Sequence, residues 1–188
     1  MLAACLPLLY FAFAAAIACA YHRQTNHHLT AAKGSALLSA IMSAPPSLPS
    51  KPCLSLDIAK TVADACRAEA QRHNWTVVIS IVDDGGNLMY LEKMDSTQLG
   101  SIAVSQDKAV SALLFKRPTK VFSDMVLDKG SVNMMALRNA IAVEGGVPLF
   151  IDKVIVGAIG ISGVTSAQDG QIAAAGAAHF NSLYGSVL

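Results

Sequence analysis

Neither sign of charge dominates this sequence of 188 residues, which holds 14 Lys and Arg against 13 Asp and Glu. A basic excess that would indicate nucleic-acid binding is missing, and so is an acidic run that would form a solvating tail. Acidic residues are absent from residues 1–56, whereas the remaining stretch holds all 13 acids against 11 bases, which is 14 minus Arg23, Lys33 and Lys51. The N-terminal third therefore differs in composition from the rest of the chain.

The sequence also lacks the motifs of the common enzyme classes. It has no nucleophile elbow, no His-Glu-x-x-His, no P-loop and no Gly-x-Gly-x-x-Gly after a strand. Catalytic residues therefore stay unassigned. The cysteines show neither Cys-x-x-Cys nor haem-attachment spacing. Cys66 is expected in the core, with a Cys53–Cys66 disulfide as the alternative in an exported chain.

Residues 1–20 form an almost unbroken apolar run that ends in Ala18-Cys19-Ala20. Such a run before a small-x-small site is typical of a secretory signal peptide, although the usual basic start is missing. This favours a secreted or otherwise exported protein. An uncleaved membrane anchor is the second interpretation and an organelle transit peptide the third. Residues 21–54 are Pro- and Ser-rich towards their end and are expected to be a linker, so the folded domain should span residues 55–188.

The residues from 145 to 163 hold two runs of β-branched and large apolar side chains, separated by Asp152-Lys153. This pattern predicts a β-hairpin, with a positive φ expected in its short turn. The second run is apolar at nearly every position from Val154 to Ile161, which is typical of a central strand covered on both faces. Gly157 and Gly160 leave room on that strand for a packed helix or a flat ligand.

The rest of the domain alternates between helix and hairpin patterns. A helix is expected from about residue 57 to 73, followed by strands at 75–82 and 87–93 around the turn 83–86. A second helix is expected at 101–115. The residues on its apolar face are 102, 103, 109, 110, 113 and 114. A short helix with irregular chain should follow at 119–142, and a final helix at 167–184. Because short turns join each strand pair, the fold class is α+β with an antiparallel sheet covered by helices.

The motifs that carry a family resemblance occur in order along this domain: Trp75-Thr76-Val77, Val82-Asp83-Asp84-Gly85-Gly86-Asn87-Leu88, Met94-Asp95, Lys108-Ala109, Pro118-Thr119, Gly145-Gly146-Val147-Pro148, Gly157-Ala158-Ile159-Gly160-Ile161-Ser162-Gly163, Gln168-Asp169 and Ala175-Gly176. Together they resemble the GlcG/HbpS-like haem-binding (haem-degrading) family over about residues 54–183. The module is also similar to the C-terminal domain of PduO-type corrinoid adenosyltransferases. The resemblance implies a profilin-like antiparallel sheet flanked by helices, homo-oligomers and, in some members, bound haem b.

The resemblance also implies a site. Haem-binding members present a threonine after proline to the iron, and the matching residue here is Thr119. Phe115 would then form an apolar wall, and Lys108, Lys116, Arg117 and Lys120 would pair with the propionates. The strand that carries Gly157 and Gly160 would form the floor. The alternative roles are an N-cap for Thr119, a solvated helix end for the lysines and helix packing for the glycines. His73 and His179 are expected to be structural.

Three functions remain open from the sequence. The first is haem binding or haem handling. The second is an oligomeric module, without catalysis, for another small ligand such as a corrinoid or an organic acid. The third is a ligand-free scaffold. Because the charge is balanced, nucleic acid is not expected as a partner of this protein. A membrane is expected as a partner only if the N-terminal segment is not cleaved.

Overall fold

The computed structural model describes residues 47–184, and the compact unit of the chain begins at Ser50. The predicted signal peptide at residues 1–20 and nearly all of the predicted linker lie outside the described residues. Within residues 47–184, no helix is long and apolar enough to cross a membrane. Ser55, at which the domain was predicted to begin, is the N-cap of the first described helix.

The sheet has four strands, β1 (Val78–Asp83), β2 (Leu88–Lys93), β3 (Gly146–Ile151) and β4 (Val154–Ser162), in the order β2-β1-β4-β3. Every neighbouring pair is antiparallel, which confirms the α+β class and both predicted hairpins. The β3–β4 turn consists of Asp152 (φ 47°) and Lys153 (φ 68°). Positive φ at both positions matches the twist of the two strands, so the expected conformation is confirmed at residues that carry side chains.

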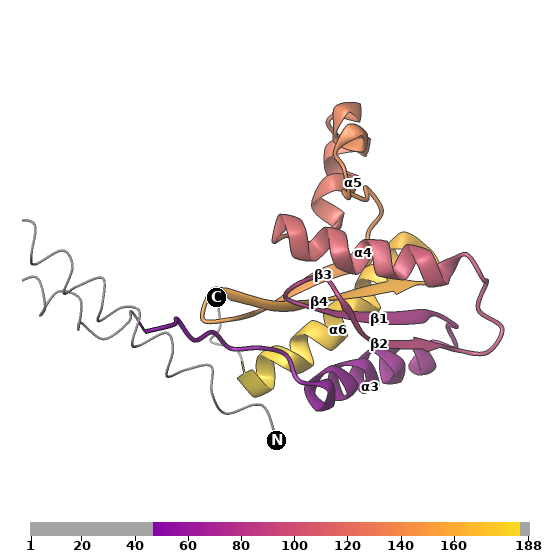
Figure 1. Ribbon diagram of the computed structural model, residues 1–188. Coiled ribbons are helices and arrows are strands. Elements are labelled where there is room, and N and C mark those ends of the chain that lie inside the picture. The colour runs from indigo at the N-terminus through magenta and orange to yellow at the C-terminus, as the bar shows by residue number, and fades with distance from the viewer. Residues whose placement is uncertain (1–46, 185–188) are drawn as a thin grey trace, which may run out of the picture. The chain divides into compact units, whose positions relative to one another are not determined.

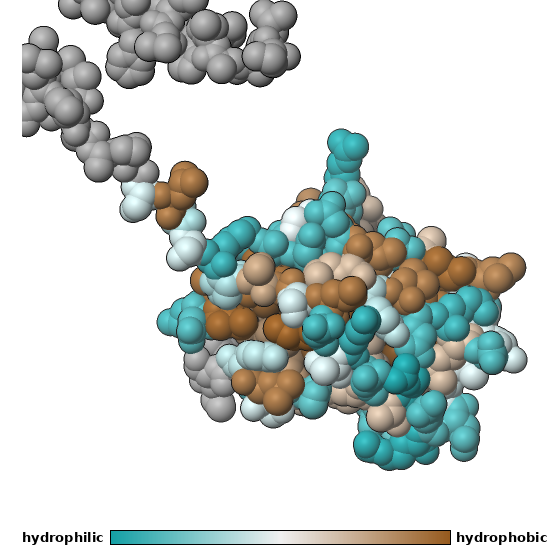
Figure 2. Space-filling view, turned by 60° about the horizontal axis from the view of Figure 1, so that its bottom comes forward, coloured by the Kyte–Doolittle hydropathy of each residue, from teal (hydrophilic) through white to brown (hydrophobic). Residues whose placement is uncertain are grey.

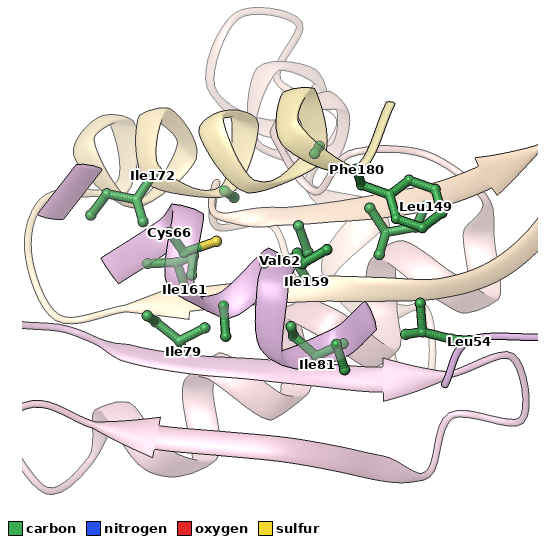
Figure 3. Packing of buried hydrophobic residues seen from close by; sticks show 14 of the residues in the cluster. Leu54, Val62, Cys66, Ile79, Ile81, Leu149, Ile159, Ile161, Ile172 and Phe180 are labelled. Atoms are coloured by element: carbon green, nitrogen blue, oxygen red, sulfur yellow. The ribbon is translucent and has the colours of Figure 1, made fainter. Parts of the chain in front are cut away.

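One face of the sheet is covered by two helices, α3 (Leu56–Arg72) and α6 (Ser166–Tyr184), which pack against each other (Figure 1). Helix α3 is capped by Ser55, whose hydroxyl accepts a hydrogen bond from the Ile58 N–H at 3.3 Å. The main core lies between these helices and the sheet, and Figure 3 shows it. Its larger members are Leu54, Val62, Cys66, Ile79, Ile81, Leu149, Ile159, Ile161, Ile172 and Phe180. Cys66 is buried and unpaired, so the structure confirms a core cysteine and not the disulfide.

Helix α4 (Ser101–Phe115) covers the opposite face of the sheet, mainly over β4 (Figure 1). Its boundaries are as predicted, and Ala109 and Leu113 of the predicted apolar face are buried, but part of that face was wrong. Ala103 and Leu114 are exposed, whereas small and polar residues, among them Ser105 and Ser111, are buried. The reason is steric. A Cβ on Gly160 would overlap the carbonyl oxygen of Ser105, so the helix axis lies too close to the sheet for large side chains.

Helix α5 (Lys120–Leu127) and the 3-10 turn η1 (Val132–Ala136) follow α4 and project away from the sheet (Figure 1). The sequence predicted this segment as a short helix with irregular chain, and the structure agrees. It exposes several large apolar side chains, namely Val121, Leu127, Val132, Met135 and Leu137. On the face that Figure 2 shows, hydrophobic residues also gather in contiguous patches between hydrophilic ones. Large apolar side chains are therefore grouped on the surface of this segment, as they are at surfaces that contact another molecule.

Candidate ligand-binding site

Thr119, the predicted iron ligand, lies at the start of α5 with none of its surface exposed. Its backbone N–H donates to the Gly146 carbonyl oxygen at 3.0 Å, and its hydroxyl oxygen accepts the Gly146 N–H at 2.9 Å. The side chain makes no capping bond to α5. The hydroxyl therefore ties the start of β3 to the α4–α5 junction, and Thr119 holds the N-cap position of α5 through its backbone carbonyl alone.

Lys108 is also buried, with 1% of its side chain exposed. Its Nζ donates to Asp169 Oδ2 at 2.7 Å and to the Ile161 carbonyl oxygen at 2.9 Å. Burial lowers the pKa of Lys108 and raises the pKa of Asp169, because a nonpolar environment disfavours both charged forms. The pair joins α4 to β4 and α6, so the geometry gives Lys108 a structural role and leaves its ammonium out of reach of a propionate at the surface.

Other residues of the chain fill the space beside the two glycines that were predicted to form the floor of the site. A Cβ on Gly160 would lie 2.6 Å from the Ala109 nitrogen, and a Cβ on Gly157 would lie 3.0 Å from Leu54 Cδ2. Gly160 therefore allows α4 to approach the sheet, and Gly157 lies beneath Leu54. Neither glycine opens onto a cavity in this chain, so the geometry favours the packing alternative that the sequence left open.

Phe115 and Lys116 end α4 at a cluster of aromatic and basic side chains. The Phe115 ring meets the Phe122 ring edge to face at 5.1 Å, and the Arg117 guanidinium lies 5.9 Å from the centroid of the Phe122 ring. Lys116 has φ 53°, the left-handed conformation that stops α4 and turns the chain towards Pro118. This turn brings the three residues 116–118 to the rim of a groove.

The groove has a volume of about 1160 Å³ and lies over the edge strand β3, between the α4–α5 junction and the C-terminal half of α6. Its apolar walls come from Val147, Pro148, Phe150, Ala177 and Ala178, and its polar residues are Lys116, Arg117, Asp152, Lys153 and Asn181, with Pro118 between them. Pro148 suits this position because an edge strand has N–H groups that need no partner in the sheet. Of the predicted site residues, Lys116 and Arg117 line the groove.

The sequence reasoning missed the walls of this groove. Gly145-Gly146-Val147-Pro148 and Ala175-Gly176 were recognised as family motifs, but the ligand was assigned to the glycine-bearing strand and not to the edge strand. The usable signal was Pro148, which marks β3 as an edge strand.

The histidines of the domain contribute no metal centre. His73 stacks on Trp75 with ring centroids 4.3 Å apart, and its Nε2 lies 3.2 Å from Glu69 Oε1 and 3.1 Å from Gln171 Nε2. This arrangement joins the end of α3 to α6, in line with the structural role expected for His73. Among the described residues, no three His, Cys, Asp or Glu side chains are grouped so that they could hold a metal ion.

Known proteins with a similar sequence or fold show which family this chain resembles. Protein GlcG of Escherichia coli K12 is 40% identical over 112 residues, which cover 60% of this chain and 83% of that protein. The crystal structure of Klebsiella pneumoniae protein ORFY matches with a TM-score of 0.67 at 30% identity, covering 74% of this chain and 98% of that one. PduOC, solved as a complex with haem, matches with a TM-score of 0.63 at 28% identity, covering 69% of this chain and 96% of that one.

A family model for the haem-degrading protein HbpS-like matches residues 54–178, which is nearly the whole described domain. The motifs, the fold and these relatives agree, and the chain therefore belongs to the HbpS-like family of haem-degrading proteins.

Proposed function

We propose that this protein binds haem, or a closely related tetrapyrrole, in the groove over β3. The observation that carries the proposal is the combination of a large apolar trough with three cationic side chains at its rim. A cavity of about 1160 Å³ exceeds the roughly 300–1,000 Å³ of most small-molecule sites, which suits a planar macrocycle better than a small metabolite.

The two chemical halves of the groove match the two halves of such a ligand. Val147, Pro148, Phe150 and Ala177 would contact the porphyrin face, which has little polarity. Lys116 and Arg117 lie on the α4 side and Lys153 on the β3–β4 turn. The edge of the ligand that carries its carboxylates could therefore be paired with cations at one end of the groove or at the other. The bound group would supply its iron and its redox chemistry, while these residues orient it and exclude water from one face.

The family adds support to this assignment. The matching model describes haem-degrading proteins, and the related PduOC was solved with haem. A corrinoid is also a large macrocycle, but its periphery carries amides where haem carries carboxylates, so three cations at one groove favour haem.

Titration of the full chain with haemin tests the proposal. A Soret band that shifts and saturates near one haem per chain is expected. Ala178→Trp should abolish binding because it fills the groove from α6, whereas Ala167→Trp should not, since this exposed residue lies 11 positions earlier on the same helix, roughly 16 Å away. Equal binding by both variants would place the haem elsewhere, and no saturable shift in the native chain would rule out the function.

A second pair of variants tests whether the positive charges at the rim of the groove contribute to haemin binding. Arg117→Glu reverses a charge that lines the groove, and Lys60→Glu reverses an exposed charge on α3, outside the groove. The first should weaken haemin binding about tenfold or more, because a charge-assisted hydrogen bond is lost and a repulsion is gained. The second should leave the affinity within twofold. Equal effects would mean that only the net charge of the protein matters.

A further inference from the structure

The groove contains no side chain of the kind that holds haem iron. The common protein ligands of haem iron are His, Cys, Met and Tyr, and the family resemblance adds the threonine that matches Thr119. In the described part of the chain, the eleven lining residues include none of these four types. Lys116 and Lys153 do not replace them, because a protonated lysine ammonium has no lone pair to give to a metal. Asp152 and Asn181 offer only hard oxygens, which are outside the set that haem proteins use.

The remaining candidates do not line the groove, and these include His179, which lies on α6 between the lining residues Ala178 and Asn181. The Thr119 hydroxyl oxygen is fully buried and accepts the Gly146 N–H. The His73 ring is stacked on Trp75 at the joint between α3 and α6, and it does not line the groove. An axial bond from Thr119 to an iron in the groove would therefore require this fully buried side chain, which does not line the groove, to be uncovered.

We infer that the groove recognises the apolar face and the carboxylates of a tetrapyrrole and not its metal, so that iron-free dicarboxylic porphyrins bind as tightly as haem. This inference rests on the proposed function and narrows it. The ligand class becomes planar tetrapyrroles with acidic side chains, whatever their centre contains. Because no metal–protein bond has to break on release, such a site is suited to passing its ligand on and not to retaining it for catalysis.

The test compares three ligands on the full chain: haemin, protoporphyrin IX and the dimethyl ester of protoporphyrin IX. Haemin binding is followed by absorbance and the two iron-free ligands by their own fluorescence. The dissociation constants for haemin and protoporphyrin IX are expected to agree within about threefold. The ester should bind at least tenfold more weakly, because it keeps the apolar face and loses both charges.

The outcomes separate the inference from the function on which it rests. Haemin binding that is tenfold or more tighter than protoporphyrin IX binding overturns the inference and leaves haem binding standing; an iron ligand donated by a second copy of the chain would produce this result. An ester that binds as well as the free acid overturns the recognition of carboxylates. If neither haemin nor protoporphyrin IX binds, the proposed function fails together with the inference. Arg117→Glu should weaken haemin and protoporphyrin IX by the same factor, and a selective loss for haemin also counts against the inference.

Discussion

Replacing Gly160 by alanine tests most directly whether the glycines of β4 serve packing or a ligand. The new Cβ would overlap the Ser105 carbonyl oxygen and lie 2.6 Å from the Ala109 nitrogen and 2.9 Å from its Cβ. These atoms belong to the backbone of α4 or to a side chain that cannot rotate away. The helix itself would have to move off the sheet.

The expected cost follows from how little α4 can move. Overpacking a core generally costs about 1–3 kcal/mol. Here the buried Lys108–Asp169 ion pair and the 2.7 Å hydrogen bond between Ser80 and Ser105 fasten the helix to the sheet and to α6, so relaxation is restricted. We therefore expect about 3 kcal/mol, a large fraction of the 5–15 kcal/mol that stabilises most domains. In a domain of this size this corresponds to a fall in melting temperature of roughly 10 °C.

Gly100→Ala is the matched control in the same part of the fold. Gly100 precedes the first turn of α4 with φ −59°, and an added Cβ there would meet nothing within 4 Å. Its melting temperature should stay the same or rise slightly, because alanine reduces the freedom of the unfolded chain. Calorimetry on both variants, followed by haemin titration, decides the question. A Gly160→Ala protein that melts within about 3 °C of the native protein and loses haemin would refute our reasoning and place the ligand at the glycines.

The other predictions concern charge, assembly and processing. Asp169→Ala should cost about 3–5 kcal/mol in chemical unfolding, because it leaves the buried Lys108 ammonium unpaired, and adding Lys108→Met should recover part of the loss. The hydrogen bond from Gln171 lowers the pKa of Glu69, so the stability that it contributes should be lost as the pH falls through that lowered value, and Glu69→Gln should flatten this part of a melting-versus-pH curve. Light scattering should report a homo-oligomer, since the α5–η1 segment leaves large apolar side chains exposed; a monomer at micromolar concentration contradicts this. Intact-mass analysis should find mature protein that begins at Tyr21 or later, not at Met1.

Patterns within a single element predicted most of the fold. The apolar run of β4, the turn residues Asp83–Gly86 and the period of α3 each depend on neighbours in the sequence, and each was read correctly. The buried face of α4 was predicted only in part, because it depends on what the helix packs against. Opposite Gly160 the best-fitting residues are Ser105 and Ala109, and hydrophobicity alone ranks Leu114 above both.

The candidate site was less predictable because its residues meet only in the folded chain. The Lys108–Asp169 pair joins residues 61 positions apart, and the Thr119–Gly146 contact joins residues 27 positions apart. A lysine in helix α4 gives no sign of which carboxylate will neutralise it. Among the groove walls, Phe150, Ala177 and Ala178 belong to no motif, since nothing in a sequence distinguishes a wall alanine from a core alanine.

The motifs that mark the family converge on one junction beside the groove. A Cβ on Gly145 would lie 2.8 Å from Lys108 Nζ and 2.9 Å from Asp169 Cβ, and one on Gly146 would lie 2.6 Å from Thr119 Cγ2. Gly146 is also paired with Gly160 across the β3–β4 ladder. These contacts occupy Gly145, Gly146, Thr119 and Lys108, so these four residues would position the proposed site without touching its ligand.

Two motifs of this junction also contain residues that line the groove. Pro118 stands before Thr119, and Val147 and Pro148 stand after Gly146, so the junction sets the distance between two walls. Substituting a junction residue should therefore change melting temperature and binding together. Substituting Phe150 or Ala178 should change the affinity for haemin with little effect on melting, because both residues lie outside the buried core. If this division holds, the shared motifs identify the scaffold, and the choice of ligand depends on the less distinctive residues along β3 and α6.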